Sequence, residues 1–353
     1  ITIAGNLTAT GTVAAVMNAG ITVNGSVDIG ANTSFDPKAY THTFKGNYTN
    51  NGSTISDATN TSTIVMNGTS AQAISGTGLY FYNLTANNSL GVTTSTSFSI
   101  AKNFTNDAGF GVTGTPTTTF NGTTAQAIGG ATAPAFYNLT LNNSTGLTIN
   151  NDVTVNNTMT FTAGNVTTGT GNTLIVGSSG SVARTSGHVV GRLRKYFPTG
   201  SSISREFEIG EGTNYLPVSI SSASVSTAGY LTVYMTAGDH PNLGGSGSNI
   251  DPTKSVNRYW TLTKEGTLAF SSYNATFNYL STDNDDTTVV ADYIVQRYLS
   301  GTWNNTTLTT PDPSTTQTSI SGESGDGAFA IGRSTVAAFE RENEFVYSRE
   351  LSY

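Results

Sequence analysis

The first half of this sequence carries few side chains that could act as acids, bases or nucleophiles. Residues 1–183 contain five aspartates, spread from Asp28 to Asp152, but no glutamate, arginine or cysteine. Cleavage of a polysaccharide needs titratable groups that meet at one bond, and this spacing does not bring two carboxyl groups together. We therefore expect no enzyme, and we keep a polysaccharide-active β-helix enzyme as an alternative. No catalytic motif surrounds the three histidines, which are His42, His188 and His240.

One turn in the second half is rich in carboxylates. Asp283, Asp285 and Asp286 lie close together in a single Asp-Asn-Asp-Asp segment, and calcium prefers oxygen-rich loops of this kind. The bidentate glutamate that completes a full calcium loop is missing downstream, so a solvated acidic turn is the favoured interpretation. Calcium is the one cofactor that the sequence suggests.

Composition argues against several classes of function. The net charge of −7 disfavours binding to nucleic acid. Without cysteine, the chain can form no disulfide and no thiolate metal site. It has no run of about 18 apolar residues, so we expect no membrane-spanning segment. Ile1 already lies in an alternating Ile-Thr-Ile segment, which we interpret as a mature end or a cut.

The first half is built from short alternating segments. In residues 139–141, 147–149, 153–155 and 159–161, each segment has an apolar residue, a threonine and a second apolar residue, and Asn or Gly follows within a few positions. Alternation turns one face of a strand inward, while Asn and Gly accept the backbone of sharp corners. Short strands joined by corners, with no helical period, predict an all-β solenoid similar to a right-handed β-helix.

A long internal repeat supports the solenoid. The segment Met66–Ile74 returns as Phe120–Ile128, which gives a repeat of about 54 residues. Inside the repeat, apolar residues such as Leu139 and Met159 occupy equivalent places in consecutive alternating segments. Their separation of about 20 residues is the size of one solenoid coil, so each repeat should contain two to three coils.

Composition also divides the chain into three parts. Residues 1–187 form the predicted solenoid, with internal repeats of about 54 residues. In residues 188–333, about eight longer alternating segments separated by turn-forming clusters predict an antiparallel β-sandwich, with Trp260 and Trp303 as core anchors. Residues 334–353 form a charged tail, which we interpret as a linker or as a strand donated to a neighbour.

Several segments resemble a known family. The pattern Phe-Asn-Gly-Thr-x-Ala-Gln-x-Ile-x-Gly at residues 120–130, the Tyr-Trp-Thr-Leu of residues 259–262 and the Gly-Ala-Phe-Ala-Ile-Gly of residues 327–332 are similar to segments of large exported surface proteins of Bacteroidota-type bacteria. The resemblance extends to about Gly332. It implies a cell-surface or extracellular location, an adhesin-like role and, in many members, export by the type IX secretion route. It implies no catalytic residue.

These observations predict an extracellular structural or adhesive protein: a cell-surface filament subunit or adhesin that assembles head-to-tail as a homo-oligomer or polymer. The end coils of a solenoid expose unpaired backbone groups, which invite the addition of a strand. We expect Ile1 and Ile3, or Phe345 and Tyr347, to take part in that inter-subunit strand pairing. The alternative is a carbohydrate-binding adhesin, in which exposed Tyr and Trp side chains of the sandwich stack on glycans.

Overall fold

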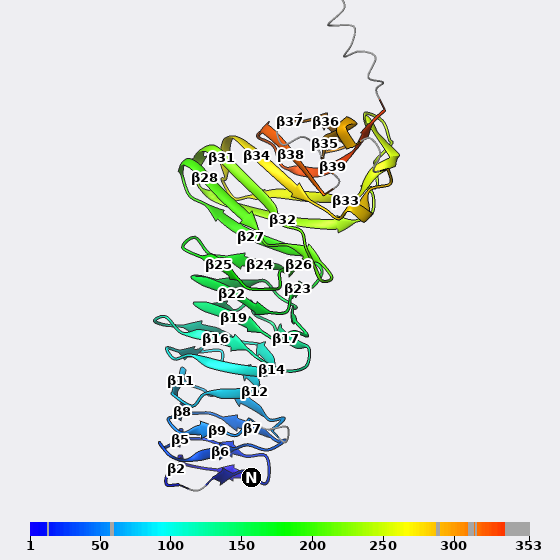
Figure 1. Ribbon diagram of the computed structural model, residues 1–353. Helices are drawn as coiled ribbons and strands as arrows, with labels where there is room; N and C mark the ends of the chain where they lie inside the picture. Colours follow the sequence, from blue (N-terminus) through cyan, green and yellow to red (C-terminus); the bar gives the residue numbers. More distant parts are fainter. Residues whose placement is uncertain (13, 57–59, 287–289, 310–313, 315, 336–353) are drawn as a thin grey trace, which may run out of the picture. The chain divides into compact units, whose positions relative to one another are not determined.

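The computed structural model describes residues 1–335 except positions 13, 57–59, 287–289, 310–313 and 315. The described chain is all β apart from two short 3₁₀ turns, η1 (Ser281–Asp283) and η2 (Val290–Asp292). It forms two compact units (Figure 1). The solenoid unit comprises residues 1–196 and 208–215, and the sandwich unit comprises residues 197–207 and the chain from Leu216 onward.

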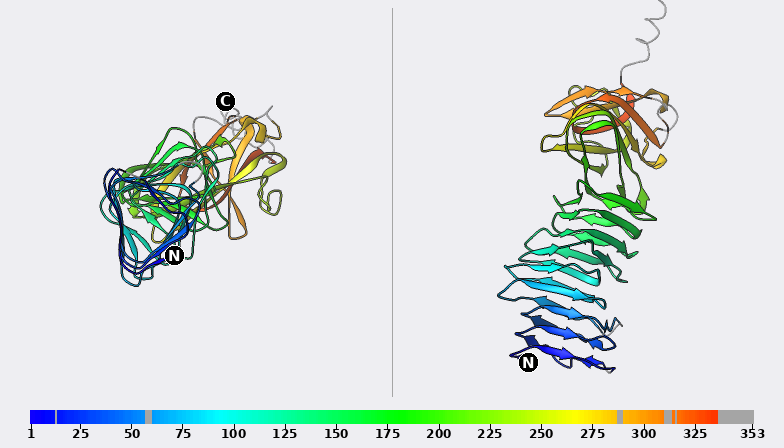
Figure 2. Two further views of the ribbon diagram at one scale, coloured as in Figure 1. Left: turned by 90° about the horizontal axis from the view of Figure 1, so that it is seen from below. Right: turned by 90° about the vertical axis from the view of Figure 1, so that its left-hand side faces the viewer.

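The solenoid unit confirms the predicted fold, because its chain winds through about ten coils of short parallel strands stacked along one axis (Figures 1 and 2). Face 1 contains β1 (Thr2–Ile3), β4 (Thr22–Val23), β7 (Thr41–Phe44), β10 (Thr63–Met66), the second halves of β12 (Tyr80–Ala86) and β14 (Phe98–Asn106), β17 (Gln126–Gly129), β20 (Leu147–Ile149), β23 (Val166–Thr168) and β26 (Val189–Val190).

The other two faces follow the same order of coils. Face 2 contains β2 (Leu7–Ala9), β5 (Val27–Ile29), β8 (Tyr48–Asn50), β11 (Gln72–Gly76), β13 (Val92–Thr94), β15 (Phe110–Val112), β18 (Ala135–Phe136), β21 (Val153–Val155), β24 (Thr173–Val176) and β27 (Arg192–Phe197). Face 3 contains β3 (Ala15–Val16), β6 (Ser34–Asp36), β9 (Ser53–Thr54), the first halves of β12 and β14, β16 (Thr117–Phe120), β19 (Asn138–Asn142), β22 (Thr158–Ala163) and β25 (Ser181–Arg184).

Successive coils are in register, with steps that match the prediction. Thr2 pairs with Thr22 in the next coil, so one coil takes about 20 residues. The long repeat contains between two and three coils, as expected, because Met66 ends a strand of face 1 whereas Phe120 ends a strand of face 3. Equivalent segments of the two repeats therefore build different corners of the solenoid.

Alternate apolar side chains form columns inside the coils. On face 1, Val23, Phe44, Met66 and Ala86 pair in consecutive coils, and each is fully buried. Burial of apolar area at about 25 cal/mol per Å² is the main favourable term for such a stack. Each coil packs against the coil before it and the coil after it, so the buried columns form one core along the axis.

Buried amide side chains close one corner of the solenoid. Gln72 Nε2 donates hydrogen bonds to the carbonyl oxygens of Phe44 (2.9 Å) and Gly46 (2.6 Å). Its Oε1 accepts from the backbone N–H of Gly68 (2.7 Å) and from Nδ2 of Asn88 (3.0 Å). We call Gln72 and Asn88 the first amide clamp. It forms hydrogen bonds with backbone N–H and C=O groups that lie at the corner, outside the hydrogen bonds between strands.

A second amide clamp forms at the equivalent segment of the next repeat. Gln126 Nε2 donates to the carbonyl oxygen of Ile100 (2.8 Å), and its Oε1 accepts from the N–H of Gly122 (3.1 Å). Asn143 Nδ2 donates to Gln126 Oε1 (2.9 Å) and to the carbonyl oxygen of Thr124 (2.8 Å). The repeated Ala-Gln-Ala-Ile and Asn-Asn segments are therefore explained by corners that need a buried amide pair.

Two glycines occupy corners that no other residue fits. Gly76 has φ = +118° and Gly130 has φ = +112°, a region that side chains with a Cβ rarely adopt. A Cβ on Gly76 would overlap the backbone of Asn50, and a Cβ on Gly130 would overlap the backbone of Asn106. Both asparagines are fully buried, so these corners cannot move outward without opening the core.

The segment 208–215 covers the last coil of the solenoid. The N–H of Val189 donates to the carbonyl oxygen of Glu208 (2.8 Å). The carboxylate of Glu208 lies 2.5 Å from the ammonium nitrogen of Lys195, and both side chains are at most 10% exposed. The segment ends in a hairpin of β29 (Gly210–Glu211) and β30 (Asn214–Tyr215). The solenoid unit thus extends beyond the boundary predicted between residues 187 and 188.

The sandwich unit contains two antiparallel sheets. One has the order β32 (Gly229–Ala237), β33 (Ile250–Glu265), β39 (Gly327–Ser334), β35 (Tyr293–Leu299) and β36 (Thr302–Asn305). The other has the order β28 (Gly200–Phe207), β31 (Val218–Thr227), β34 (Ala269–Asn278), β38 (Gln317–Glu323) and β37 (Thr307–Leu308).

Aromatic side chains join the two sheets and confirm the predicted sandwich. The ring of Trp260 on β33 lies 5.0 Å from that of Phe277 on β34, and Phe277 lies 5.4 Å from Phe329 on β39. Trp260 is fully buried and Trp303 is 7% exposed, as expected for core anchors. Neither tryptophan is available to stack on a glycan, which removes that support from the carbohydrate-binding alternative in the sandwich.

Candidate functional site

The acidic turn of the sandwich unit contacts protein groups. The carboxylate of Asp283 receives two hydrogen bonds from the guanidinium of Arg258, at 3.1 and 3.2 Å. Asp285 Oδ1 accepts from Nδ2 of Asn257 (2.7 Å), and Asp286 forms a longer ion pair with an arginine of β39. Within the described ranges, no group of three or more His, Cys, Asp or Glu residues could hold a metal ion. Calcium at this turn stays a prediction, and the contacts favour a structural role.

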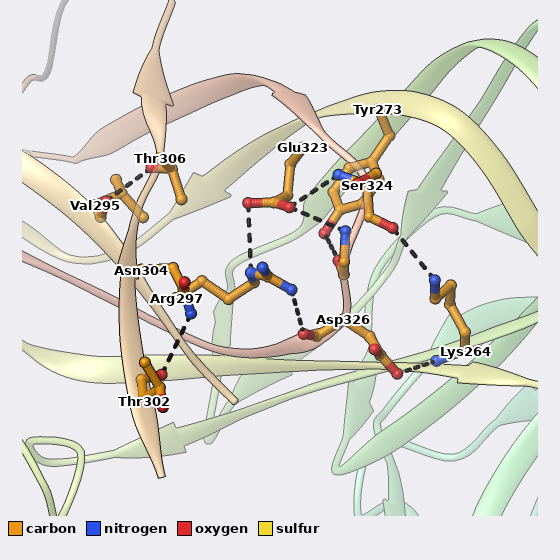
Figure 3. Close-up of polar contacts among 11 residues, drawn as sticks. Lys264, Tyr273, Val295, Arg297, Thr302, Asn304, Thr306, Glu323, Ser324 and Asp326 are labelled. Carbon is orange, nitrogen blue, oxygen red and sulfur yellow. Dashed lines mark hydrogen bonds and ion pairs between the residues drawn. The ribbon is translucent and has the colours of Figure 1, made fainter. Parts of the chain in front are cut away.

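A second group of charged residues lies at the turn between β38 and β39 (Figure 3). Arg297 Nε lies 3.5 Å from Glu323 Oε2, and Arg297 Nη1 donates to the carbonyl oxygen of Asp326 (3.0 Å). Glu323 Oε1 also accepts from two backbone N–H groups of the turn. Burial, together with the nearby Glu323, raises the pKa of Tyr273 well above its usual value. These groups hold the turn, so we assign the network a structural role.

The three histidines lie in separate surroundings. His42 is on β7 of the solenoid, His188 precedes β26, and His240 follows β32 of the sandwich. His42 is fully buried, with Nε2 2.8 Å from the carbonyl oxygen of Pro37. Burial is the largest cause that lowers the pKa of each histidine, and the positive charge of Arg184 adds to it at His188. In all three, the folded protein favours the neutral imidazole.

This burial makes the stability of the solenoid unit sensitive to acid. Below about pH 6.5 the unfolded chain binds a proton at His42, whereas the folded chain, in which burial lowers the pKa of this histidine, binds it only at a lower pH. Stability should therefore fall as the pH drops from 7.5 to 5.5, by up to about 1.4 kcal/mol per pH unit for this one group. Urea denaturation followed by circular dichroism at both pH values measures the change.

The variant His42→Gln tests the assignment of that pH dependence. Glutamine keeps an N–H donor for Pro37 but does not titrate, so the loss of stability between pH 7.5 and 5.5 should become smaller than in the wild type. An unchanged loss would show that His42 does not carry it.

The first coil presents a partly exposed apolar surface. Ile3, Leu7 and Ala9 are half-buried, whereas the residues that pair with them one coil later are fully or almost fully buried. Ile1 is 79% exposed and Val16 is 40% exposed. Together with Met17 and Ile21, most of these side chains line a hollow of about 370 Å³.

The backbone of the first coil also offers unpaired strand edges within the described chain. β1, β2 and β3 are each the end strand of a sheet among the described residues, so one edge of each strand has N–H and C=O groups without a neighbouring strand there. Sequence alone singles out Ile1 and Ile3 but not Val16. Phe345 and Tyr347, the other residues expected to pair between subunits, lie outside the described residues.

Comparisons with protein-family models, curated proteins and solved structures found no match to this chain. The resemblance to exported bacterial surface proteins therefore stays a prediction. In the part of the chain that the structure describes, no helix has the length and apolar character needed to cross a bilayer. The candidate site is accordingly defined by its geometry alone: a coil that offers both an apolar surface and strand edges.

Proposed function

We propose that this protein is an extracellular structural protein of the cell surface, which assembles when the first coil of one copy accepts a β-strand from a second copy. The observation that carries the proposal is the first coil, where half-buried apolar residues coincide with three end strands. Addition of a strand would supply backbone hydrogen bonds and cover the apolar residues in one step.

Two further features support this role. At the far end of the solenoid, residues 208–215 cover β26 of face 1. β25 is an end strand there, so the first coil differs from that end by its partly exposed apolar residues. The sides of the solenoid are rich in Thr, Ser and Asn, and its buried amides satisfy corner backbone groups. A contact between two different surfaces of one chain produces an open filament when its rotation does not close into a ring.

Sedimentation velocity over a wide concentration range tests the assembly. The wild-type chain should form species whose mass grows with concentration, and negative-stain electron microscopy should show chains of particles. Val16→Asp should weaken the association at least tenfold, because it places a charge in the hollow of the first coil. Monomers alone at the highest concentration would contradict the proposal.

Leu90→Asp is the matched control. Leu90 is 62% exposed, in a turn between β12 and β13, and it is not one of the residues that line the hollow. This variant adds the same charge at an apolar surface residue elsewhere, so it should associate like the wild type. Equal weakening by both variants would show that net charge, and not the first coil, controls assembly.

A further inference from the structure

A groove on the side of the solenoid arises where one of its corners is lost. In β12 and β14 the chain runs straight from face 3 to face 1 as one long strand, while the next coil turns through residues 121–125 between β16 and β17. The pairing of β12 with β14 shifts between Phe81 and Asn83, so one residue on β12 faces two on β14. Such bulges bend a strand and redirect its side chains.

The bulge creates the space that the groove occupies. At the bulge Tyr82 faces Ala101 and Lys102, and Ala101, with its small side chain, lines the groove together with the tyrosine. Tyr80 and Tyr82 alternate with Phe81 on β12, so they project from the same side of the strand, and both are half-buried. The turn at residues 121–124 also lines the groove, whose volume is about 460 Å³. This volume lies in the range of small-ligand sites.

The chemistry of the walls is aromatic and neutral. Asn121, Thr123 and Thr124 are exposed and present amide and hydroxyl groups beside the two tyrosines. Among the residues that the structure describes, the lining of the groove, which includes Ser56, has no charged side chain; residues 57–59 lie outside that description. At its border, the ammonium of Lys102 donates to the carbonyl oxygen of Ala125 (2.6 Å) and to Thr124 Oγ1 (3.2 Å), so its hydrogen bonds are directed at the protein.

We propose that this groove binds a neutral oligosaccharide. The C–H face of a sugar ring stacks on a tyrosine ring, while its hydroxyl groups exchange hydrogen bonds with amide and hydroxyl side chains. The groove combines both kinds of partner, because Tyr80 and Tyr82 line it together with Asn121 and Thr123. A proline-rich peptide also prefers aromatic grooves, but the hydroxyl-rich wall favours the sugar.

A panel of neutral oligosaccharides built from glucose, mannose, galactose or xylose tests the proposal. At least one should bind the wild-type chain, and isothermal titration should show that Tyr82→Ala weakens the binding at least tenfold. Asn121→Ala, at an exposed position that does not endanger the fold, should weaken it about threefold. Tyr82→Phe keeps the ring and should bind within about threefold of the wild type.

Tyr137→Ala is the control from the sister repeat. Tyr137 corresponds to Tyr82 in the repeated Tyr-Asn-Leu-Thr segment and is also half-buried, but it does not line the groove. Binding to this variant should equal that of the wild type. The proposal is overturned if no neutral sugar binds at millimolar concentration, if uronic-acid oligosaccharides or a proline-rich peptide bind instead, or if Tyr82→Ala and Asn121→Ala bind normally.

This inference does not depend on the assembly proposed above. The titration can be made with Val16→Asp, which alters the first coil and leaves the groove unchanged. A wild-type chain that stays monomeric but binds the sugar would reject only the proposed function, and a wild-type chain that assembles but binds no sugar would reject only the groove.

Discussion

Gly76→Ala should unfold the solenoid unit or destabilise it by more than about 4 kcal/mol. Two effects act together at this corner: the positive φ of +118° and the overlap of the new Cβ with the backbone of Asn50. Because the residues around Asn50 are packed at the core, the corner cannot relax outward. Urea denaturation followed by far-ultraviolet circular dichroism measures the loss.

Two other glycines separate the causes of that effect. Gly91 has φ = +96° but open space at its Cβ position, so Gly91→Ala should cost only about 1–2 kcal/mol of backbone strain. Gly5 has neither a positive φ nor a close neighbour, so Gly5→Ala should be nearly neutral. If Gly76→Ala were as stable as Gly5→Ala, the described corner would be wrong.

Asn143→Ala should lower the free energy of unfolding of the solenoid unit by about 2–4 kcal/mol. The change removes hydrogen bonds to Gln126 and Thr124 and leaves Gln126 Oε1 buried with one partner fewer. It also frees the N–H of Thr145, which donates to Asn143 Oδ1 (3.0 Å). An unsatisfied buried polar group costs more than the bond itself contributed.

The neighbouring residue provides the control for this prediction. Asn142 is exposed whereas Asn143 is buried, so Asn142→Ala should change stability by less than about 0.5 kcal/mol. Tryptophan fluorescence supplies a second control, because Trp260 and Trp303 both belong to the sandwich unit. Equal costs for the two asparagines would contradict the amide clamp.

The alternating segments are sufficient to predict the fold class, because alternation of apolar and polar residues is the pattern of a strand with one buried face. The steps of the repeat also predict the coil length. Sequence cannot show that β12 and β14 pass a corner without turning, since their alternation continues through a bulge at Tyr82. It also places the end of the solenoid too early, at residue 187. The coils continue through residues 188–196, and residues 208–215 return to the solenoid unit from a later part of the chain.

The interior amides escape sequence analysis for a different reason. Asn and Gln are usually exposed, so the pattern places Asn88 and Asn143 at corners without indicating that they are buried. The signal that could have found the clamps is that both repeats have glutamine at the equivalent position, Gln72 and Gln126. A solvent-exposed position would not require the same residue in both repeats. The acidic turn shows the opposite case: the partner of Asp283 is Arg258, on a different strand, and no local pattern predicts that contact.

Hydrogen exchange in the first coil tests the acceptance of a strand most directly. Amides of residues 1–16 should exchange more slowly in a concentrated, assembled sample than in a dilute one, because an added strand would bond the edges of β1, β2 and β3. Amides of β14, in the middle of the solenoid, should exchange equally in both samples. Equal exchange of residues 1–16 at both concentrations would contradict assembly through the first coil.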